Sequence, residues 1–428
     1  MGSKLSREST TNDAPVPEHI DFEDFDILRS IGKGSFGKVC IVKRKKTASE
    51  VYAMKYMSKS VCWKQNMIDH VLRELEILSK VEHPFLVNLW FTFQDDEDIF
   101  MVSDLLLGGD LRYHIQKGVQ FTIDDVRIYV CELASVLEYL ESKNIVHRDI
   151  KPDNILLDEK GHPHLTDFNI ATVLTDQHPT SNHFAGTKPY AAPEVFKAGL
   201  REGEGYKYEV DWWSLGVTMY EVLRHKRPFE IDGDTSYTDA YNILKEGTIS
   251  VQTDWPDSLK TMFFKFFKFN TSQRLCNVDK LYKLELFSSI NQDEVLTNLQ
   301  PKFIPSQTHL NYDPTYELEE LIIESNPLHK KKQRILKRKK TKERKLQRMN
   351  SETASESNTA EDLEDQALIR ISEQFQPFNR KWQALKSTSQ STEQDESSKL
   401  SSSESESDCI NEVTISESKD SVQGNDET

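Results

Sequence analysis

Cysteine is sparse in this sequence of 428 residues, and its five copies are scattered. They are Cys40, Cys62, Cys131, Cys276 and Cys409, and no two form a Cys-x-x-Cys pair. This pattern argues against a disulfide framework and against a zinc site of the usual ligand spacing. It is typical of a protein in a reducing compartment.

Long apolar runs are missing as well. No stretch of 18 apolar residues exists, so no membrane-spanning helix is expected. The start has no apolar core of a secretory signal. It reads MGSKLSRES instead, which fits the myristoylation pattern, with Gly2 as the acceptor and Ser6 at the required place. The basic Lys4 and Arg7 also suit an anionic surface, whereas the alternative is a disordered leader without a lipid.

The composition changes along the chain and suggests four parts. We predict a disordered leader over 1–24, a globular domain over 25–290, an extension over 291–350 and a Ser- and acid-rich disordered tail over 351–428. Much of the net charge of −16 comes from acid near the C-terminus. Residues 330–348 hold twelve Lys or Arg and one acid, which predicts a solvated basic helix suited to a membrane surface or to nuclear import.

The globular part begins with strand-like patterns and continues with helical ones. Strand-like runs occupy 25–32, 38–44, 51–57, 86–94 and 98–106. Apolar residues at helical spacing mark 66–81, and beyond residue 110 helical patterns such as 123–142 dominate. The sequence therefore predicts an α+β fold in which a small β-rich lobe is joined to a larger helical lobe.

A glycine-rich segment, IGKGSFGKV (31–39), lies between two of these strand-like runs. Glycine lets the backbone approach a phosphate without a side-chain clash. The pattern alone is weak, because a plain glycine hairpin would look the same. It is not a dinucleotide fingerprint, because a strand and not a helix follows it.

Charged residues downstream have the spacing of a phosphoryl-transfer site. Lys55 lies on a strand (VYAMK) and Glu74 on the helical stretch, so the two can pair and fix the lysine for phosphate binding. In IVHRDIKPDN, Asp149 can accept a hydroxyl proton, and Asn154 offers a neutral oxygen ligand for a hard divalent ion. Asp167 in HLTDFNIATV is a second ligand candidate, although a strand-end cap would explain it equally well by itself.

Together with GTKPYAAPE (186–194) and DWWSLG (211–216), these motifs stand in an order that resembles the eukaryotic protein kinases. Lys151 and GTKPY fit the serine/threonine class. Three segments resemble a narrower group, the AGC-type serine/threonine-protein kinase 32 family, also called YANK kinases. They are HPFLVNLWFTFQDDEDIFMVSDLLLGGDLRYHI (83–115), DPTYELEELIIESNPLHKKKQR (313–334) and FQPFNR (375–380).

The resemblance implies a bilobal kinase fold and transfer of the ATP γ-phosphoryl group to Ser or Thr hydroxyls of proteins, with Mg²⁺ or Mn²⁺, in intracellular signalling. It implies Asp149 as the base, Lys151 as the group that stabilises the transferring phosphoryl, and a Lys55–Glu74 ion pair. It implies Asn154 and Asp167 as the metal ligands. The residues implied to surround the nucleotide are Ile31, Gly32, Lys33, Gly34, Ser35, Phe36, Gly37, Lys38, Val39, Ala53, Lys55, Asp104 and Leu106.

Further roles follow from the same resemblance. Ser103 takes the gatekeeper position, and Glu194 with Arg274 should form a buried structural pair. The positions that receive substrate arginines in AGC kinases are Asp110, Asp153 and Glu221. These acids suggest a substrate preference for basic residues, although a generally acidic surface would also account for them.

Three positions depart from the AGC pattern. His183 stands where a phosphorylated threonine is usual, so Arg148 lacks its usual phosphate partner, and Thr180 and Ser181 are out of register. We therefore expect the activation segment to order without the usual phosphate. Asn169 replaces the glycine of Asp-Phe-Gly and is expected to tolerate left-handed backbone angles. Asn379 follows the Phe-x-x-Phe of a hydrophobic motif and cannot be phosphorylated, so the segment 375–382 either docks by aromatic burial or is an unstructured Phe pair.

Two alternatives to an active kinase remain at this point. One is a pseudokinase scaffold that acts through its tails, and the other is a membrane-tethered interaction module in the basic and acidic tail. We expect a monomer without specific nucleic-acid binding, located in the cytoplasm, at a membrane or in the nucleus.

Overall fold

The computed structural model describes residues 19–33, 37–47, 49–297, 299–309, 311–312, 328, 331, 360–384 and 386. The chain forms two units, His19–Phe378 and a second unit whose described part begins at Asn379. The positions Gly2, Gly34, Ser35, Phe36 and Cys409, named above, lie outside the described residues.

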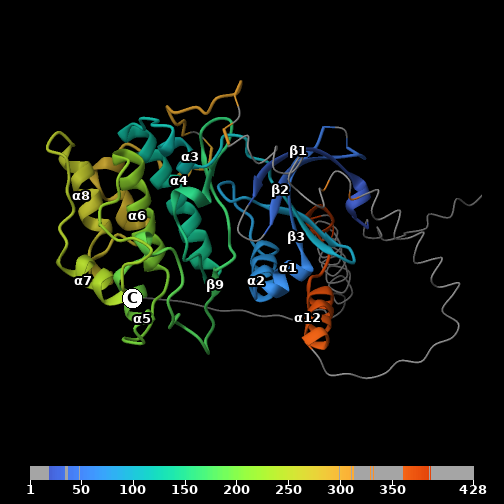
Figure 1. The fold of residues 1–428 in the computed structure, drawn as a ribbon. Coiled ribbons are helices and arrows are strands. Elements are labelled where there is room, and N and C mark those ends of the chain that lie inside the picture. The colour runs from blue at the N-terminus through green and yellow to red at the C-terminus, as the bar shows by residue number, and fades with distance from the viewer. Residues whose placement is uncertain are drawn as a thin grey trace, which may run out of the picture. The chain divides into compact units, whose positions relative to one another are not determined.

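The first lobe of the larger unit is built on an antiparallel sheet with the strand order β1-β2-β3-β5-β4, to which the short β10 adds (Figure 1). The strands are β1 (Phe25–Lys33), β2 (Lys38–Arg44), β3 (Val51–Ser58), β4 (Leu89–Gln94), β5 (Asp98–Ser103) and β10 (Phe378–Asn379). The β-rich lobe predicted from sequence is thus confirmed, with β2 at the predicted bounds.

Alternation of side chains along the strands gives this sheet one buried face. Cys40, Val42 and Met54 are buried there beside Phe25 and Phe100.

The end of the predicted leader belongs to this core. Ile20 and Phe22 are 6% and 4% exposed, and the Phe22 ring lies 5.3 Å from that of Phe100. The prediction of disorder over 1–24 is therefore wrong for residues 19–24. The two apolar side chains, together with Phe25, bury enough surface to hold the segment.

Two helices cover this lobe, α1 (Lys59–Lys64) and α2 (Ile68–Leu78). α2 presents Val71, Leu75 and Leu78 to the core at helical spacing. Glu74 lies on the same buried face, so this carboxylate points inward to a partner and not to water.

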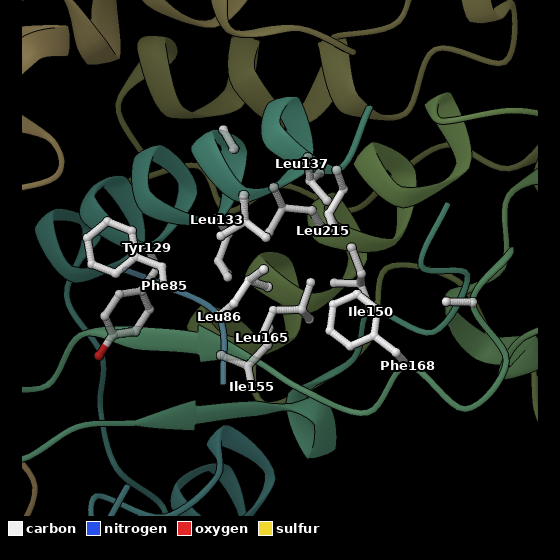
Figure 2. Close-up of a cluster of buried hydrophobic side chains, with 14 of the residues drawn as sticks. Phe85, Leu86, Tyr129, Leu133, Leu137, Ile150, Ile155, Leu165, Phe168 and Leu215 are labelled. Atoms are coloured by element: carbon white, nitrogen blue, oxygen red, sulfur yellow. The ribbon is translucent and has the colours of Figure 1, made fainter. Parts of the chain in front are cut away.

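The second lobe is mainly helical, as predicted. Its helices are α3 (Leu111–Gln116), α4 (Ile123–Ser142), α5 (Pro193–Gly199), α6 (Glu209–Arg224), α7 (Tyr237–Glu246), α8 (Asp257–Phe266) and α9 (Val278–Tyr282). Two small ladders pair β6 (Ile145–Val146) with β9 (Thr172–Val173) and β7 (Ile155–Leu157) with β8 (Pro163–Leu165). α4 starts with a capping box between Thr122 and Asp125. Figure 2 shows Leu133 and Leu137 from α4 gathered with Ile150, Leu165 and Phe168, which anchors the loops that carry the site.

The extension after the domain packs back on both lobes. The backbone N–H groups of Lys302 and Phe303 donate to Asp125 Oδ1 at 2.7 and 2.8 Å. Farther along, Lys331 is fully buried, and its Nζ lies 2.9 Å from Asp95 Oδ2 and also pairs with Asp98. The prediction of a solvated basic segment over 330–348 is wrong at this residue, because the two aspartates compensate its charge.

A helix, α12 (Ala360–Gln374), lies where the sequence predicted a disordered tail. It runs beside α1 (Figure 1) and leads to Phe375, and both Ile371 and Phe375 are fully buried. The prediction of disorder is therefore wrong for 360–374. It was based on the average composition of 351–428, which is polar although this helix has a local apolar face.

The described part of the second unit is a short helical stretch. The backbone N–H of Trp382 donates to Asn379 Oδ1 at 3.1 Å, and Lys386 Nζ lies 4.0 Å from the centre of the Trp382 ring.

Candidate active site

The strands β2 and β3 set out one wall of the site. Val39 pairs with Lys55 across these strands, and Ala53 pairs with Ser103 on β5. At Gly37 a Cβ atom would come within 2.7 Å of the Tyr56 carbonyl oxygen and closer still to Met57, so this backbone approach requires glycine. The lysine, the small alanine and the small gatekeeper position thus lie on neighbouring rungs of the sheet.

The predicted ion pair forms. Lys55 Nζ lies 2.8 Å from Glu74 Oε1 and 2.9 Å from Oε2. Burial by itself disfavours the lysine charge, but the carboxylates of Glu74 and Asp167 raise the pKa of Lys55 above its usual value. The cation is therefore held in the middle of β3, close enough to Asp167 to feel its charge.

The segment after β5, where the hinge was expected, is fixed at both ends. Trp90 Nε1 donates to Asp104 Oδ1 at 2.6 Å, and the Asn88 side chain donates to Oδ2 at 3.0 Å. The N–H of Gly108 donates to the Leu157 carbonyl at 2.9 Å, which holds the far end against β7. Leu106 lies between these two anchors, as a hinge residue should.

A buried carboxylate positions the loop that contains Asp149. Asp211 in α6 accepts from the backbone N–H groups of His147 and Arg148 at 2.7 and 2.8 Å. Arg148 has a left-handed φ of +70°, which costs energy for a residue with a side chain and is stabilised by these bonds. The DWWSLG motif thus fixes the backbone just before Asp149.

Asp149 lies at the centre of a polar network. Lys151 Nζ is 2.7 Å from its Oδ2, and Asn154 Nδ2 donates to the same oxygen at 2.9 Å. Thr187 Oγ1 donates to Asp149 Oδ1 at 2.5 Å and accepts from Lys151 at 3.0 Å. Sequence reasoning assigned no role to Thr187, although its place in GTKPY was the available signal.

Asp167 combines an unusual backbone angle with a carboxylate oxygen that lacks a partner in the described structure. Its φ is +69°, and its Oδ1 is buried with no hydrogen-bond partner in the described structure. Asn154 uses its amide nitrogen on Asp149, which leaves its oxygen as the ligand atom. A hard divalent cation would satisfy the orphaned oxygen, and such ions are commonly held by one or two protein oxygens together with phosphates. Within the described residues, no group of three or more His, Cys, Asp or Glu could hold a metal ion.

The residues after Asp167 anchor the segment but correct one expectation. Phe168 is fully buried, with its ring 4.8 Å from that of His147. The carbonyl of Asn169 lies 2.9 Å from His70 Nδ1. Within this motif the left-handed conformation occurs at Asp167 and not at Asn169. The expectation that asparagine is present to tolerate left-handed angles is therefore wrong.

Arg148 finds neutral partners in place of a phosphate. Its Nη1 donates to Ser181 Oγ at 3.0 Å and lies 3.3 Å from His183 Nε2, and its Nε donates to the Ile170 carbonyl at 2.7 Å. Burial, followed by the charges of Arg148 and Arg73, lowers the pKa of His183. A neutral imidazole can accept from Arg148, so the activation segment is held without added charge.

The expected structural pair is present in the helical lobe. Arg274 is fully buried, and its guanidinium makes a two-pronged contact with Glu194 at 2.5 and 3.0 Å.

The acids proposed to receive substrate arginines have a partner that sequence reasoning missed. Arg112 at the start of α3 lies 2.9 Å from Glu221 and 3.3 Å from Asp153. Asp110 makes no ion pair with Arg112 in the described structure and caps α3 by accepting from the Tyr113 N–H at 2.6 Å, although it is close enough to feel the charges of Arg112 and Asp153. No sequence motif contains both Arg112 and Glu221, so only the fold could reveal their pairing.

A cavity of about 720 Å³ opens where the extension crosses the hinge. It is lined by Arg29, Ile41 and Leu107 and by residues 305–309 and 311–312 of the extension. Asn311 Nδ2 donates to the Leu107 carbonyl at 2.8 Å, which ties the extension to the hinge. The phosphoryl-transfer residues do not line this cavity, so it lies beside the site and not within it.

Comparison with known proteins agrees with this geometry. The family described as "Protein kinase domain" matches residues 25–287. "Serine/threonine-protein kinase 32B" of Homo sapiens is 51% identical over 75% of this chain and 77% of that protein. "Serine/threonine-protein kinase 32C" of Homo sapiens is 46% identical over 89% of this chain and 76% of its own length. A "RAC family serine/threonine-protein kinase homolog" of Dictyostelium discoideum is 36% identical over 70% of this chain and 67% of that protein.

None of these findings favours the alternative of a pseudokinase scaffold. The expectation from the motifs, an ATP-dependent enzyme that phosphorylates protein Ser or Thr hydroxyls, is confirmed. The chain belongs to the protein kinases and, within them, to the AGC-like serine/threonine-protein kinase 32 family.

Proposed function

We propose that Asp149 orients the acceptor hydroxyl and takes its proton during phosphoryl transfer. The supporting observation is the network in which Asp149 contacts Lys151, Asn154 and Thr187 at 2.5–2.9 Å. Lys151 is placed to compensate charge on the moving phosphoryl group, and Lys55, fixed by Glu74, to hold the phosphates that stay on the nucleotide. These roles are positional and electrostatic, which is the main source of rate in this reaction.

We propose Asn154 and Asp167 as the residues that hold the divalent ion, Mg²⁺ or Mn²⁺. Such an ion neutralises phosphate charge when it is bound. The orphaned Asp167 oxygen and the neutral Asn154 oxygen supply the hard donor atoms that it prefers.

Metal removal tests this assignment. Phosphate transfer from radiolabelled ATP to protein should stop when EDTA is added, and excess Mg²⁺ should restore it. Transfer that persists in EDTA would contradict the metal sites. Comparing Mg²⁺ with Mn²⁺ in the same assay identifies the better ion.

We propose that the protein acts in the cytoplasm at a membrane surface, through lipid attachment at Gly2 and the basic segment 330–348. A single acyl chain anchors only marginally, so the basic segment would act as a second signal. Within the described part of the chain, no helix is long and apolar enough to cross a membrane.

Fractionation of cells that express the wild type or Gly2→Ala tests this proposal. The variant should move to the soluble fraction, and a Ser9→Ala variant serves as the matched control because it keeps the acceptor glycine and both basic residues. An unchanged membrane fraction for Gly2→Ala would exclude acylation as the anchor, and accumulation in the nucleus would favour the import alternative.

We also propose that the protein is a monomer. Sedimentation of the purified protein would test this oligomeric state.

We propose that any preference for basic substrates depends on Asp110 more than on Asp153 and Glu221. Arg112 already pairs with the last two. Burial raises the pKa of Asp110, whereas the nearby charge of Arg112 acts in the opposite direction. Because Arg112 is close to all three acids, the preference should be modest.

A further inference from the structure

Arg112 and three side chains from other elements, those of Asp153, Tyr190 and Glu221, form one cluster. Its Nη1 donates to Glu221 Oε1 at 2.9 Å, and its Nη2 to Glu221 Oε2 at 3.3 Å. Its Nε donates to Asp153 Oδ2 at 3.3 Å, and Nη2 also contacts the Tyr190 hydroxyl. Tyr190 in turn donates to Glu221 Oε2 at 2.6 Å. The fork-shaped guanidinium therefore occupies both oxygens of Glu221 and reaches a second acid.

The cluster is next to the place where the acceptor hydroxyl must lie. Asp153 directly precedes Asn154, whose side chain contacts Asp149. Tyr190 is the last residue of a short 3₁₀ turn that begins just after Thr187, which donates to Asp149 at 2.5 Å. A peptide with its acceptor at Asp149 therefore passes close to Asp153 and Arg112.

The exposed fractions of these side chains determine which charges a bound peptide can contact. The side chains of Asp153 and Arg112 are 46% and 23% exposed, whereas that of Glu221 is 8% exposed. Although burial disfavours the charge, the hydrogen bond to Glu221 raises the pKa of Arg112 above its usual value. An incoming substrate arginine would thus encounter a fixed cation, with most of the acid already paired to it.

We propose that Arg112 determines substrate selection by filling, from within the chain, the acidic subsite beside the acceptor. The wild type then gains little from arginine at the substrate position that reaches this cluster. Removal of the Arg112 charge uncovers two carboxylates and creates a preference for arginine. This inference rests on the proposed function, because it requires the acceptor to lie at Asp149.

Positional scanning of serine peptides tests this inference. Arginine or alanine is placed in turn at each position near the acceptor, and the ratio of the two phosphorylation rates is recorded. The wild type should show a ratio below about two at the affected position, because Arg112 neutralises the acids. Arg112→Ala and Arg112→Gln should raise this ratio about tenfold, which corresponds to about 1.4 kcal/mol.

Arg127→Ala is the matched control. Arg127 is also a partly exposed, ion-paired arginine, 28% exposed and 3.6 Å from Asp124, but it lies on α4 away from the cluster. Its ratio should equal that of the wild type. Melting curves accompany every variant, and Arg112→Gln keeps hydrogen-bond donors for Glu221 if the alanine variant is unstable.

Several outcomes would overturn the inference. One is an unchanged ratio in active Arg112 variants, and another is a strong preference for arginine already in the wild type. If both Arg112 variants were inactive while Arg127→Ala remained active, Arg112 would be required for structure and would not determine substrate selection. No transfer to any peptide by any of the proteins would overturn the proposed function itself, and the inference with it.

Discussion

Among single residues, Asp167 and Asn169 share one motif but have separate consequences. The Asp167 oxygen is buried without a partner, whereas the described contact of Asn169 comes from its backbone carbonyl, which lies 2.9 Å from His70. Asp167→Asn should therefore lower kcat at least about a hundredfold, because one preorganised charge is lost. Asn169→Gly should keep kcat within about threefold of the wild type, because the change removes no side-chain hydrogen bond to the described residues.

Steady-state kinetics with a fixed peptide and varied ATP measures both variants. Equal losses in the two would contradict this separation. An inactive Asn169→Gly would assign a function to the asparagine side chain.

The activation segment provides a second test at the residue scale. Arg148 is satisfied by Ser181 and a neutral His183. Enzyme that has been treated with a phosphatase should therefore keep its activity within about twofold of untreated enzyme, because no phosphate is needed to order the segment. If the treated enzyme were inert and phosphorylation at Thr180 or Ser181 restored it, the neutral contacts would not be sufficient.

At the scale of secondary-structure elements, α12 and the docked residues that follow it are the main addition to the kinase domain. Gln94 Nε2 donates to the carbonyls of Ser372 and Phe375 at 2.7 and 2.8 Å. Lys59 Nζ, from α1, donates to Ser372 Oγ at 2.8 Å. The docking expected for 375–382 is thus seen for the part up to Phe378, which makes the alternative of an unstructured Phe pair wrong there.

Truncation of the buried aromatic should loosen this segment. Phe375 is fully buried, so Phe375→Ala should lower the melting midpoint by about 5–10 °C through lost burial and a cavity. Ile369→Ala, in the preceding helix α12, is the control, because that side chain is 56% exposed and its loss should change the midpoint by less than about 1 °C. Equal midpoints for the two variants would show that the segment does not stabilise the domain.

The elements differ in how far the sequence could predict them. β2 and α4 were predicted at their observed bounds, because period-2 and period-3.6 patterns were long and uninterrupted. α12 was missed because its apolar positions are spaced within a polar tail and its buried face depends on distant elements such as α1. Arg112 was missed for a related reason, since its partners lie on other elements far away in the chain.

At the scale of the whole molecule, one buried ion pair links stability to pH. His162 Nδ1 lies 2.7 Å from Glu132 Oε1, whose side chain is fully buried. Burial raises the pKa of Glu132 from 4.5 to about 7. Burial alone would lower the pKa of His162, but its hydrogen bond to Glu132 raises it above 6.5.

Raised pKa values at Glu132 and His162 make the folded state less stable at high pH. The folded state binds protons more tightly than the unfolded chain at both residues, so stability is lost as pH rises from about 5 to 8. Glu132→Gln should remove about 1–3 kcal/mol of this pH dependence in the free energy of unfolding. Glu230→Gln, at an exposed position, should keep the wild-type dependence. Denaturant unfolding at several pH values measures it, and parallel curves for the wild type and Glu132→Gln would contradict the assignment.

Asp149 is the residue that we place at the reacting hydroxyl of the substrate Ser or Thr. The most direct test is transfer of radiolabelled phosphate from ATP with Mg²⁺ or Mn²⁺, comparing the wild type with Asp149→Asn. The isosteric change keeps hydrogen-bonding capacity at this position but removes the base, so the rate should fall at least about a hundredfold. Equal signal from both proteins, or none from either, would contradict this account.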